Sequence, residues 1–569
     1  MSTGTAIGGR AQEPGFGDLF TPKLVTVLRE GYRLSHLRAD AIAGLTVAIV
    51  ALPLSMAIAI ASGATPAQGL YTAIVGGFFV SLLGGSRFQI GGPAGAFIVL
   101  VAATVMAHGM DGLILATLLS GLLLTAVGFL RLGTYIKFIP YPVTVGFTAG
   151  IAVIIFASQI RDMLGLSLTG PEPGPLLEKL PVLWAALPGF DPATVALALA
   201  TILLIVGLKR WRASLPEMLI AIAATSLAAW ALDLEVATIG TQFGGIPSAL
   251  PMPTLPEITL DRVVAVLPSA FAFTLLGSIE SLLSAVVADG MTGRRHRSNC
   301  ELVAQGVANV ASALFSGICV TGTIARTATN VRSGAHGPVA GMLHAVFLLA
   351  FMLVAAPLAS YIPLAALAGV LAVVAWNMIE KHAIAMLMRA SWGDAAVLSV
   401  TFGLTIFRDL TEAIIVGFAL GSVIFIHRMS QVAAVATHVP FVREDEADDA
   451  NRTPYEETAA TDPSIVVYRI SGVFFFGAAA SIGSVLDRIS DAHRALIIDF
   501  SGVPLVDATA ANTIEVLAHK AARRDIRIVL TGTSRPIRHE LFLHGIKPPL
   551  VRYERSIDVA LAKLRREIG

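Results

Sequence analysis

Charged side chains are scarce in this sequence. Asp, Glu, Lys and Arg make up only 14% of its 569 residues and 55% belong to the hydrophobic set, whereas soluble proteins carry about 25% charged residues. The scarcity ends at Pro440: 35 of the 130 residues from there onward are charged, against 44 of the 439 before it. This division predicts an apolar membrane domain followed by a soluble domain of about 110 residues.

Several kinds of functional site are also missing. Two cysteines, Cys300 and Cys319, are too few for a disulfide framework. The sequence has no Walker loop, no metal-ligand cluster and no Ser/His/Asp constellation, so we expect neither an enzyme nor a nucleotide-driven pump, and no metal or cofactor. A net charge of +1 gives no reason to expect a nucleic-acid partner. The first 20 residues lack a signal peptide's apolar region and cleavage site, so insertion is expected to begin at the first span.

Apolar runs alternate with short polar breaks between Asp40 and Met429. A helix needs about 20 apolar residues to cross a bilayer, and the pattern predicts 14 spans, two of them short. Their expected extents are 40–60, 67–84, 93–107, 112–130, 140–158, 191–208, 215–232, 263–289, 302–318, 324–333, 338–358, 363–379, 394–407 and 411–428.

The distribution of Lys and Arg predicts the orientation of these spans. Lys23, Arg29, Arg33 and Arg38 precede the first span and place the N-terminus in the cytoplasm. Bases also follow the even-numbered spans: Arg87, Arg131, Lys137, Lys209, Arg210, Arg212, Arg294, Arg295, Arg297, Lys381, Arg389 and Arg428. An even number of spans returns the C-terminus to the cytoplasm, as expected for a multi-pass protein of a bacterial inner membrane.

Four domains are expected along the chain. They are a cytoplasmic N-terminal segment (1–38), a transmembrane domain (39–430, with inverted repeats at about 39–232 and 263–430), an acidic linker (431–461) and a soluble domain (462–569). In the last one, strand patterns at 465–468, 496–500 and 526–530 alternate with helical patterns near 478–491, 509–523 and 535–543. This alternation predicts a small sheet with helices on one or both faces.

Glu280 lies near the middle of the eighth predicted span, with Ser284 one turn further along the same helix face. An ionisable residue at membrane depth marks an ion or proton pathway by default, and the alternative is a protonated carboxyl that bonds between helices. The span contains no basic partner for Glu280, which favours ion coupling. We expect His344 to be a core histidine with satisfied hydrogen bonds, and Asn309 and Asn330 to bond between helices.

Two predicted spans are short and interrupted. Residues 89–96 combine extended chain, a Gly-Gly-Pro break and a half-helix that opens at Pro93, and residues 320–327 repeat this design. They are the third spans of two seven-span halves, which indicates an inverted-repeat transporter with a midplane site. Opposed half-helix N-termini present N–H groups and partial positive charge, so they predict an anion site, to which Arg326 adds a full charge. The alternative is a packing kink at each break.

Four short motifs add a resemblance to these patterns. They are LRADAIAG at 37–44, PAQGLY at 66–71, GGSR at 84–87 and DFSGVPLVDAT at 499–509. With them the chain resembles, over almost its whole length, the sulfate permease (SulP) family of anion transporters and the STAS domain that its members carry. The resemblance implies a polytopic α-helical membrane protein of 14 spans in a 7+7 inverted repeat, with core and gate domains, followed by a cytoplasmic α/β STAS domain. It also implies a homodimer and elevator-type transport.

The resemblance further implies the roles of individual residues. The anion lies between spans 3 and 10, and Glu280 and Ser284 serve the coupling ion, a proton or sodium. The implied cradle for the anion consists of Ala94, Gly95, Ala96, Thr323, Ile324, Ala325 and Arg326.

Departures from one branch of the family bear on the substrate. A cyanobacterial sodium/bicarbonate member has threonines where this chain has Ala94 and Ile324, which argues against bicarbonate. The stretches 277–283, 289–293 and 376–378 are similar to the C4-dicarboxylate branch instead. We therefore expect proton-coupled uptake of succinate or fumarate, slightly ahead of sulfate. Sodium-coupled bicarbonate transport, anion exchange and a channel are the alternatives.

Asp507 and Thr509 are the candidate regulatory residues of the STAS-like domain. Bacterial relatives of this domain are phosphorylated on a hydroxyl two residues after an aspartate, and Thr509 has that spacing. The alternative is that one of the two residues caps a helix. A cytoplasmic STAS-binding protein is a further expected partner. An alternative function of another class is a membrane anion sensor that signals through the STAS domain.

Overall fold

The computed structural model describes residues 15–136, 140–168, 170, 172–173, 175–212, 216–408, 410–432, 434–437, 465–474 and 494–568. The chain forms two compact units, Met1–Phe418 and Ala419–Gly569, and each is described by itself. Most of the predicted linker, the predicted helix near 478–491 and Lys137 lie outside the described residues.

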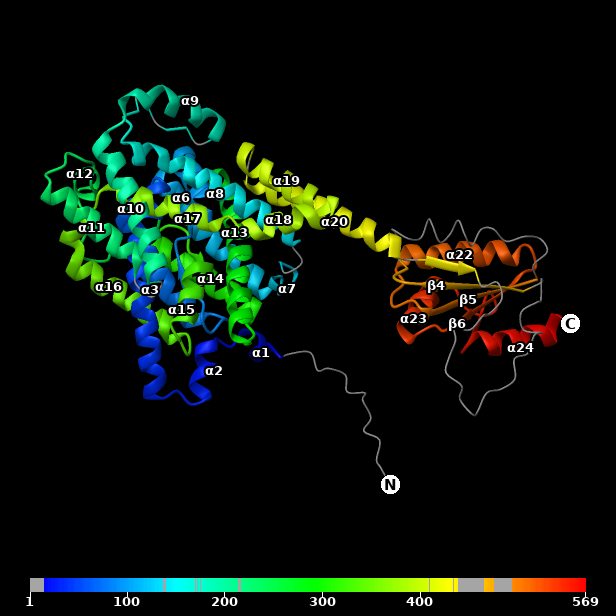
Figure 1. The fold of residues 1–569 in the computed structure, drawn as a ribbon. Helices are drawn as coiled ribbons and strands as arrows, with labels where there is room; N and C mark the ends of the chain where they lie inside the picture. Colours follow the sequence, from blue (N-terminus) through cyan, green and yellow to red (C-terminus); the bar gives the residue numbers. More distant parts are fainter. Residues whose placement is uncertain are drawn as a thin grey trace. The chain divides into compact units, whose positions relative to one another are not determined.

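The first unit is helical (Figure 1). All 14 predicted spans coincide with helical segments, and nine helices of the described residues are long and apolar enough to cross a membrane. The segments that match the spans are α3 (Leu34–Ala61), α4 (Pro66–Tyr71) with η1 (Thr72–Gly76) and α5 (Gly77–Leu83), η2 (Gly95–Phe97) with α6 (Ile98–Phe129), α8 (Tyr141–Leu164), α10 (Pro192–Trp211), α11 (Glu217–Ala231), α13 (Leu260–Thr292), α14 (Ser298–Leu314), α15 (Ile324–Arg332), α16 (Val339–Ala359), α17 (Leu364–Met378), α19 (Trp392–Phe407) and α20 (Leu410–Val432).

Short helices accompany these spans. The third and fourth predicted spans belong to the single element α6, which is kinked at Gly109, where φ is 69°. The sequence analysis did not predict α9 (Leu176–Ala186) and α18 (Lys381–Ala390), because they are too short and too polar to be read as spans. The remaining short helices are α1 (Phe16–Phe20), α2 (Lys23–Arg29), α7 (Gly133–Ile136), η3 (Leu187–Gly189) and α12 (Ile239–Phe243).

Helices of the first half of the unit pack against helices of the second half. The main pairs are α3 with α16, α6 with α13 and α14, and α8 with α17 and α19. Glycines allow the closest approach: a Cβ on Gly121 of α6 would lie 2.7 Å from the carbonyl oxygen of Gly306 on α14. Such small-residue contacts let membrane helices associate by close van der Waals packing. The two halves therefore form one interlocked body.

Asp40 joins the start of α3 to the loop between α15 and α16. Its side chain is fully buried and accepts hydrogen bonds from the Tyr32 hydroxyl at 2.6 Å and from the backbone N–H groups of His336 at 2.6 Å and Gly337 at 3.0 Å. The His36 ring stacks on the His336 ring, with centroids 3.7 Å apart. Burial raises the pKa of Tyr32, and the hydrogen bond to Asp40 adds to this effect. A residue assigned from sequence to a span end is therefore a buried anchor.

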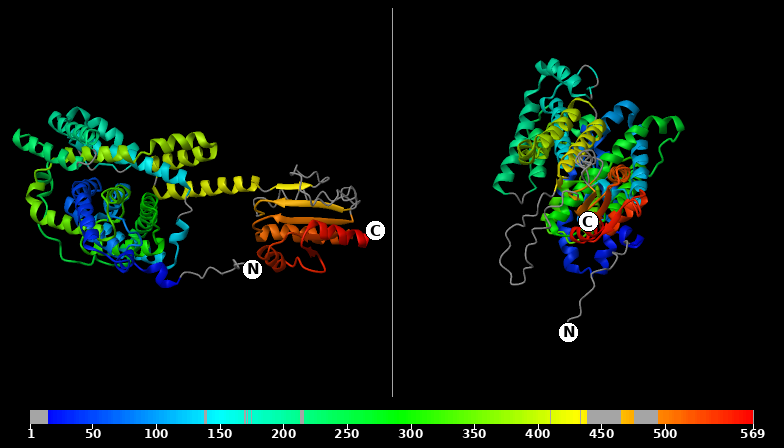
Figure 2. Two further views of the ribbon diagram at one scale, coloured as in Figure 1. Left: turned by 60° about the horizontal axis from the view of Figure 1, so that its bottom comes forward. Right: turned by 90° about the vertical axis from the view of Figure 1, so that its right-hand side faces the viewer.

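The second unit is a five-stranded sheet with helices on both faces (Figures 1 and 2). The strand order is β3 (Ala434–Thr437), β4 (Ile465–Ser471), β5 (Ala495–Gly502), β6 (Arg527–Thr531) and β7 (Arg552–Glu554). Only β3 runs antiparallel to its neighbour. The helices α22 (Ala508–Ala522) and α23 (Arg535–Leu543) cover one face, and α24 (Ile557–Ile568) covers the other. Residues 434–437 were expected in the linker, but they form β3 because they pair with β4. A stretch of four residues is too short for its sequence to predict such a long-range contact.

Asp40→Ala is expected to destabilise the first unit by on the order of 3 kcal/mol, because it leaves two buried N–H groups and a hydroxyl without their acceptor. Thermal unfolding of the purified protein in detergent measures this as a lower midpoint. Asp111→Ala, at an exposed position of α6, is the matched control and should leave the midpoint unchanged. Equal midpoints for the wild type and Asp40→Ala would contradict the anchoring role.

Candidate functional site

The two interrupted segments meet as a short antiparallel ladder. Strand β1 (Gly91–Gly92) pairs with β2 (Thr321–Gly322), so that Gly91 lies opposite Gly322 and Gly92 lies opposite Thr321. All four residues are buried. The sequence analysis expected each segment to be extended before its half-helix, and the ladder shows that the two extended pieces bond to each other. Such pairing satisfies backbone groups that have no water partner at membrane depth.

A helix begins directly after each strand. The turn η2 leads into α6 after Ala94, and α15 begins after Thr323. The first N–H groups of a helix have no acceptor within the helix, so the amides near Gly95 and Ala96 and those of Ile324, Ala325 and Arg326 are available to an anion. The N–H of Thr323 donates to the Ile90 carbonyl instead, at 3.0 Å. Thr323 therefore holds the ladder together in this structure.

Arg326 reaches from α15 to the other half of the site. Its side chain is 2% exposed, and Nη2 donates to Ser55 Oγ on α3 at 3.1 Å and to the Pro93 carbonyl at 3.3 Å. Its Nε and Nη1 are buried and have no hydrogen-bond partner among the described residues. A buried guanidinium with two unsatisfied nitrogens is costly unless an anion or water completes it. Arg326 is thus a buried group rather than one at the rim of the site.

Glycine at position 92 makes room for this guanidinium. A Cβ on Gly92 would lie 2.1 Å from Nη1 of Arg326, and a Cβ on Gly322 would lie 1.9 Å from Nε2 of Gln89. Both distances are far below van der Waals contact, so any side chain at either position displaces a polar group of the site. The Gly-Gly-Pro break therefore interrupts the span and also leaves the space that the Arg326 guanidinium occupies.

Helix α13 brings Glu280 and two serines to the second half of the site. The Ser281 hydroxyl lies 2.7 Å from the Thr321 hydroxyl and accepts from the Gly322 N–H at 3.2 Å. The Ser284 hydroxyl donates to Thr327 on α15 at 3.0 Å. Glu280 is half-buried, and its Oε2 is buried without a hydrogen-bond partner in the described part of the chain. Of the predicted pair, Ser284 therefore supports the fold of the site, and Glu280 is left with unused binding capacity.

A buried polar frame surrounds the ladder. Glu301 is fully buried and accepts from the Ser86 N–H at 3.0 Å, from Gln89 at 2.9 Å and from Gln305 at 3.0 Å. Asn309 donates to the Val320 carbonyl at 2.8 Å and accepts from the N–H of the same residue at 3.0 Å. Asn309 was predicted to bond between helices, and it bonds instead from α14 to the extended chain before β2. Glu301, in the first turn of α14, was not among the candidate site residues.

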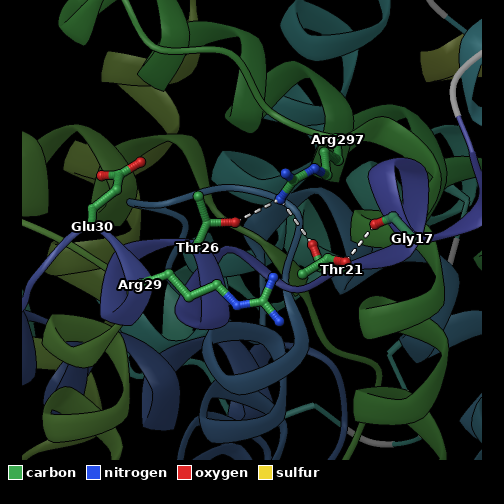
Figure 3. Close-up of a pocket in the computed structure, with 6 residues that line it drawn as sticks. All are labelled: Gly17, Thr21, Thr26, Arg29, Glu30 and Arg297. Carbon is green, nitrogen blue, oxygen red and sulfur yellow. Dashed lines mark hydrogen bonds between the residues drawn. The ribbon is translucent and has the colours of Figure 1, made fainter.

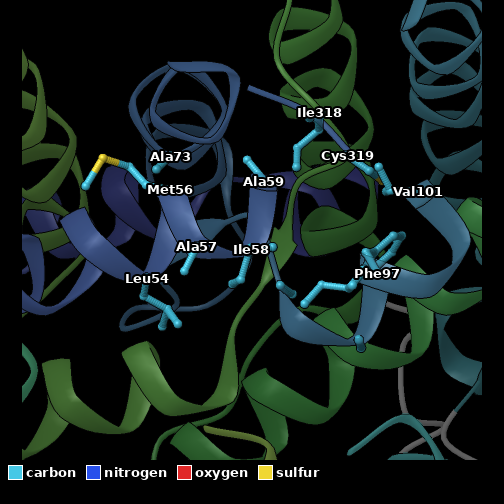
Figure 4. Close-up of a cluster of buried hydrophobic side chains, with 14 of the residues drawn as sticks. Leu54, Met56, Ala57, Ile58, Ala59, Ala73, Phe97, Val101, Ile318 and Cys319 are labelled. Carbon is cyan, nitrogen blue, oxygen red and sulfur yellow. The ribbon is translucent and has the colours of Figure 1, made fainter. Parts of the chain in front are cut away.

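Apolar side chains fill the remaining surroundings. Phe97 from the first half-helix, Ile318 and Cys319 before β2, and Leu54 of α3 belong to one buried cluster (Figure 4). Within the predicted cradle Ala94 and Ala96 are buried, whereas the Ile324 side chain is 39% exposed and Ala325 is exposed as well. The site therefore offers an anion backbone N–H groups and one guanidinium, in apolar surroundings.

The prediction for His344 is confirmed for its burial and wrong for its hydrogen bonds. This residue of α16 is fully buried, as expected for a core histidine. Neither ring nitrogen has a hydrogen-bond partner among the residues that the structure describes. Helical periodicity indicates that a residue faces the core, but it carries no information about which groups face it from other helices.

Asp507 caps α22 in the second unit. Its carboxylate accepts from the N–H of Ala510 at 2.8 Å, so this residue has the capping role that the sequence analysis offered as the alternative. Thr509 lies in the first turn of α22 and is exposed. Capping and exposure of the neighbouring hydroxyl are compatible with each other.

Comparison with known proteins agrees with this arrangement. Residues 37–401 match the model of the sulfate permease family, and residues 458–560 match the STAS domain. The chain is 38% identical to a Bacillus subtilis (strain 168) protein named "Putative sulfate transporter YvdB", over 88% of this chain and 93% of that protein.

Solved structures show the same relationship. The transmembrane domain of a cyanobacterium bicarbonate transporter, BicA, is 32% identical and superposes with a TM-score of 0.62, covering 67% of this chain and 98% of that one. The structure of SLC26A9 has only 16% identity but a TM-score of 0.83, covering 96% of this chain and 93% of that one, and so shows a shared fold. The chain therefore belongs to the sulfate permease family, as a multi-pass anion transporter with a C-terminal STAS domain.

Proposed function

We propose that this protein is a secondary active transporter that takes up a small dianion, succinate, fumarate or sulfate, together with a proton. The observation that carries the proposal is the buried Arg326 beside the two half-helix starts, whose Nε and Nη1 have no hydrogen-bond partner in the described ranges. A cation and two positive helix ends facing one apolar site favour an anion over a neutral or cationic substrate. The low polarity of the site strengthens their attraction.

The substrate cradle in this proposal consists of Ala94, Gly95, Ala96, Ile324 and Ala325 with Arg326, and Thr323 positions them through Ile90. Side-chain hydroxyls contribute little: Thr323 Oγ1 already donates to the Ile90 carbonyl at 3.2 Å. An anion here is held by backbone N–H groups and a guanidinium fork. These groups suit a carboxylate or a sulfate oxygen.

Glu280 is the proposed proton carrier, with Ser284 as its structural support. Its Oε2, which has no partner among the residues described, can bind a proton when the dianion enters and release it on the other side. Proton binding and anion binding then assist each other, because a neutral Glu280 removes a negative charge from the neighbourhood of the substrate. Sodium-coupled bicarbonate transport is the alternative, supported by the likeness to BicA.

The wider arrangement follows the family. We propose a homodimer in the bacterial inner membrane, with residues 1–38 and the STAS domain (462–569) in the cytoplasm. Within the transmembrane domain (39–430), a core domain that carries the half-helices moves in an elevator-like manner against a gate domain. Gly95 lies against Ile155 of α8 and Met378 of α17. These two helices are therefore the surface past which the half-helices would move.

The test is a competition panel in proteoliposomes. Succinate, fumarate, sulfate and bicarbonate are compared under a proton gradient, a sodium gradient or no gradient. We expect accumulation of a dianion that rises when the outside is made acidic. Accumulation of bicarbonate driven by sodium alone would overturn the proposal in favour of its alternative.

Glu280→Gln is expected to abolish gradient-driven accumulation in the same assay, because the amide has the same shape but cannot carry a proton. Glu235→Gln, at an exposed loop position, is the matched control and should accumulate substrate like the wild type. A Glu280→Gln protein that still concentrates its substrate under a pH gradient would contradict the coupling role.

Gly92→Ala tests the position of Arg326. The new Cβ would lie 2.1 Å from Nη1, so the guanidinium must leave its place, and we expect uptake to fall at least about tenfold, a loss of about 1.4 kcal/mol or more. Gly403→Ala on α19, where a Cβ meets nothing within 4 Å, is the control. Unchanged uptake by Gly92→Ala would show that the anion does not depend on this placement of Arg326.

Thr509 is the proposed regulatory residue of the STAS domain, next to the cap formed by Asp507. A phosphate in the first turn of α22 would interact favourably with the helix N-terminus and give a partner protein a new charged group to bind. Mass spectrometry of the native protein is expected to find phosphate on Thr509. Its absence under every growth condition tried would contradict the assignment.

A further inference from the structure

A cleft of about 560 Å³ lies outside the transport site, between the start of the chain and the start of α14. It is formed by α1, the turn after it, α2 and the residue that precedes α14 (Figure 3). The lining residues are Gly17, Thr21, Thr26, Arg29, Glu30 and Arg297. The transport site uses none of them.

Arg297 fixes the wall of this cleft. Its Nη1 donates to the Thr21 carbonyl at 2.9 Å and to Thr26 Oγ1 at 3.0 Å, as the dashed lines in Figure 3 show. Its backbone N–H donates to the Gly85 carbonyl at 2.9 Å. The guanidinium thus ties α1 and α2 to the helical body. Both of its acceptors are neutral, so its charge has no counter-ion among the described residues.

Arg29 is the second guanidinium of the cleft. It is exposed, and its side chain extends toward Thr21 (Figure 3). It forms no ion pair with any residue that the structure describes. Unlike Arg297, it has no structural contact to lose when a ligand binds.

The charges around the cleft add up to a surplus of positive charge. Glu30 is ion-paired with Arg87, whose hydrogen bond holds the pKa of Glu30 below its usual range. Asp289 is paired with His296 at 2.7 Å. Burial lowers the pKa of Lys23, and the nearby charges of Arg297 and Arg87 lower it further. The charges of Asp289 and Glu30 oppose this lowering for Lys23. Arg29 and Arg297 form no ion pair among the described residues, so these two guanidinium groups carry the positive charge of the cleft.

Apolar side chains border the same region. Phe16, next to the lining residue Gly17, is 63% exposed. The ring centroids of Phe16 and Phe20 are 4.6 Å apart, and those of Phe20 and Phe129, at the end of α6, are 5.3 Å apart. Phe129 and Leu130 are more than half exposed. Exposed aromatic residues beside arginines are typical of the membrane–water interface, where rings and guanidinium groups lie at the level of the headgroups.

We propose that this cleft binds the phosphate of an anionic phospholipid headgroup, with Arg29 and Arg297 as the anion ligands and Phe16 and Phe129 beside the acyl chains. Guanidinium groups bind phosphate oxygens through paired N–H donors. The inner leaflet of a membrane is rich in anionic lipid and attracts basic residues next to a span. Because the bound lipid contacts both α2 and the start of α14, it would stabilise their junction.

The experiment uses the full-length protein in a neutral detergent and measures thermal unfolding during titration with dioctanoyl phosphatidylglycerol. Phosphatidylcholine of the same chain length and free glycerol phosphate are the comparison ligands. We expect phosphatidylglycerol alone to raise the unfolding midpoint in a saturable manner. In Arg29→Gln, the phosphatidylglycerol concentration at half-saturation should rise about fivefold. This factor corresponds to the loss of about 1 kcal/mol for one basic residue.

Arg38→Gln is the matched control. Arg38 is also exposed and close to the start of α3, but it does not line the cleft, so half-saturation should stay at the wild-type value. Arg29→Lys should lie between wild type and Arg29→Gln, because it keeps the charge but loses the fork. Equal effects of the two lipids, or of the Arg29→Gln and Arg38→Gln substitutions, would overturn the proposal. Equal stabilisation by free glycerol phosphate at the same concentration would show that the cleft binds a free phosphate and would contradict the proposal that its ligand is a lipid.

Discussion

The antiparallel pairing of β1 with β2 is the contact on which the rest of the transport unit depends. It joins two interrupted helices from opposite halves of the chain at a depth where backbone N–H and C=O groups cannot bond to water. The polar groups around it serve this pairing: Ser281 and Asn309 bond directly to the chain at β2, and Thr327 holds the N–H of Ile90. A packed frame of hydrogen bonds is what allows irregular backbone to exist there.

The same frame gives the site its electrostatic character. Among the described residues, the buried side-chain atoms near the ladder that have no hydrogen-bond partner are two nitrogens of Arg326, one oxygen of Glu280 and the amide oxygens of Gln89, Gln305 and Asn330. Of these residues, only Arg326 and Glu280 can carry a charge. In an apolar environment, uncompensated charge strongly favours an ion of opposite sign. In the proposed mechanism, the scarcity of charge in the sequence thus concentrates the chemistry of the protein in two side chains, Arg326 and Glu280. His344 is another buried group without a hydrogen-bond partner among the described residues, and the proposed transport mechanism does not use it.

Outside the span interiors, several charged side chains are paired with hydrogen-bond partners, and they stabilise the contacts between helix ends and neighbouring segments. Asp40 binds the loop after α15, Glu301 binds the turn before β1, and Arg297 binds the segment before α2. By sequence position, Asp40 and Glu301 lie at the ends of predicted spans and Arg297 lies in a predicted loop beside one. Their hydrogen bonds show that these ends are packed against other parts of the unit. The helix starts are consequently as well defined as the helix interiors.

The sequence by itself determined where most of the apolar helical segments lie, the α/β character of the C-terminal unit and the two helix breaks, because hydropathy, periodicity and Gly-Pro signals are local. It also singled out Glu280 and Arg326, since a charge within an apolar run is visible without any structure. Only the tertiary structure decided that β1 pairs with β2, that Gly92 accommodates the Arg326 guanidinium, that residues 434–437 join the sheet, and that His344 lacks hydrogen-bond partners within the described part of the chain. Those facts are contacts between residues far apart in the chain, and such contacts depend on how helices and strands pack, which no local pattern records.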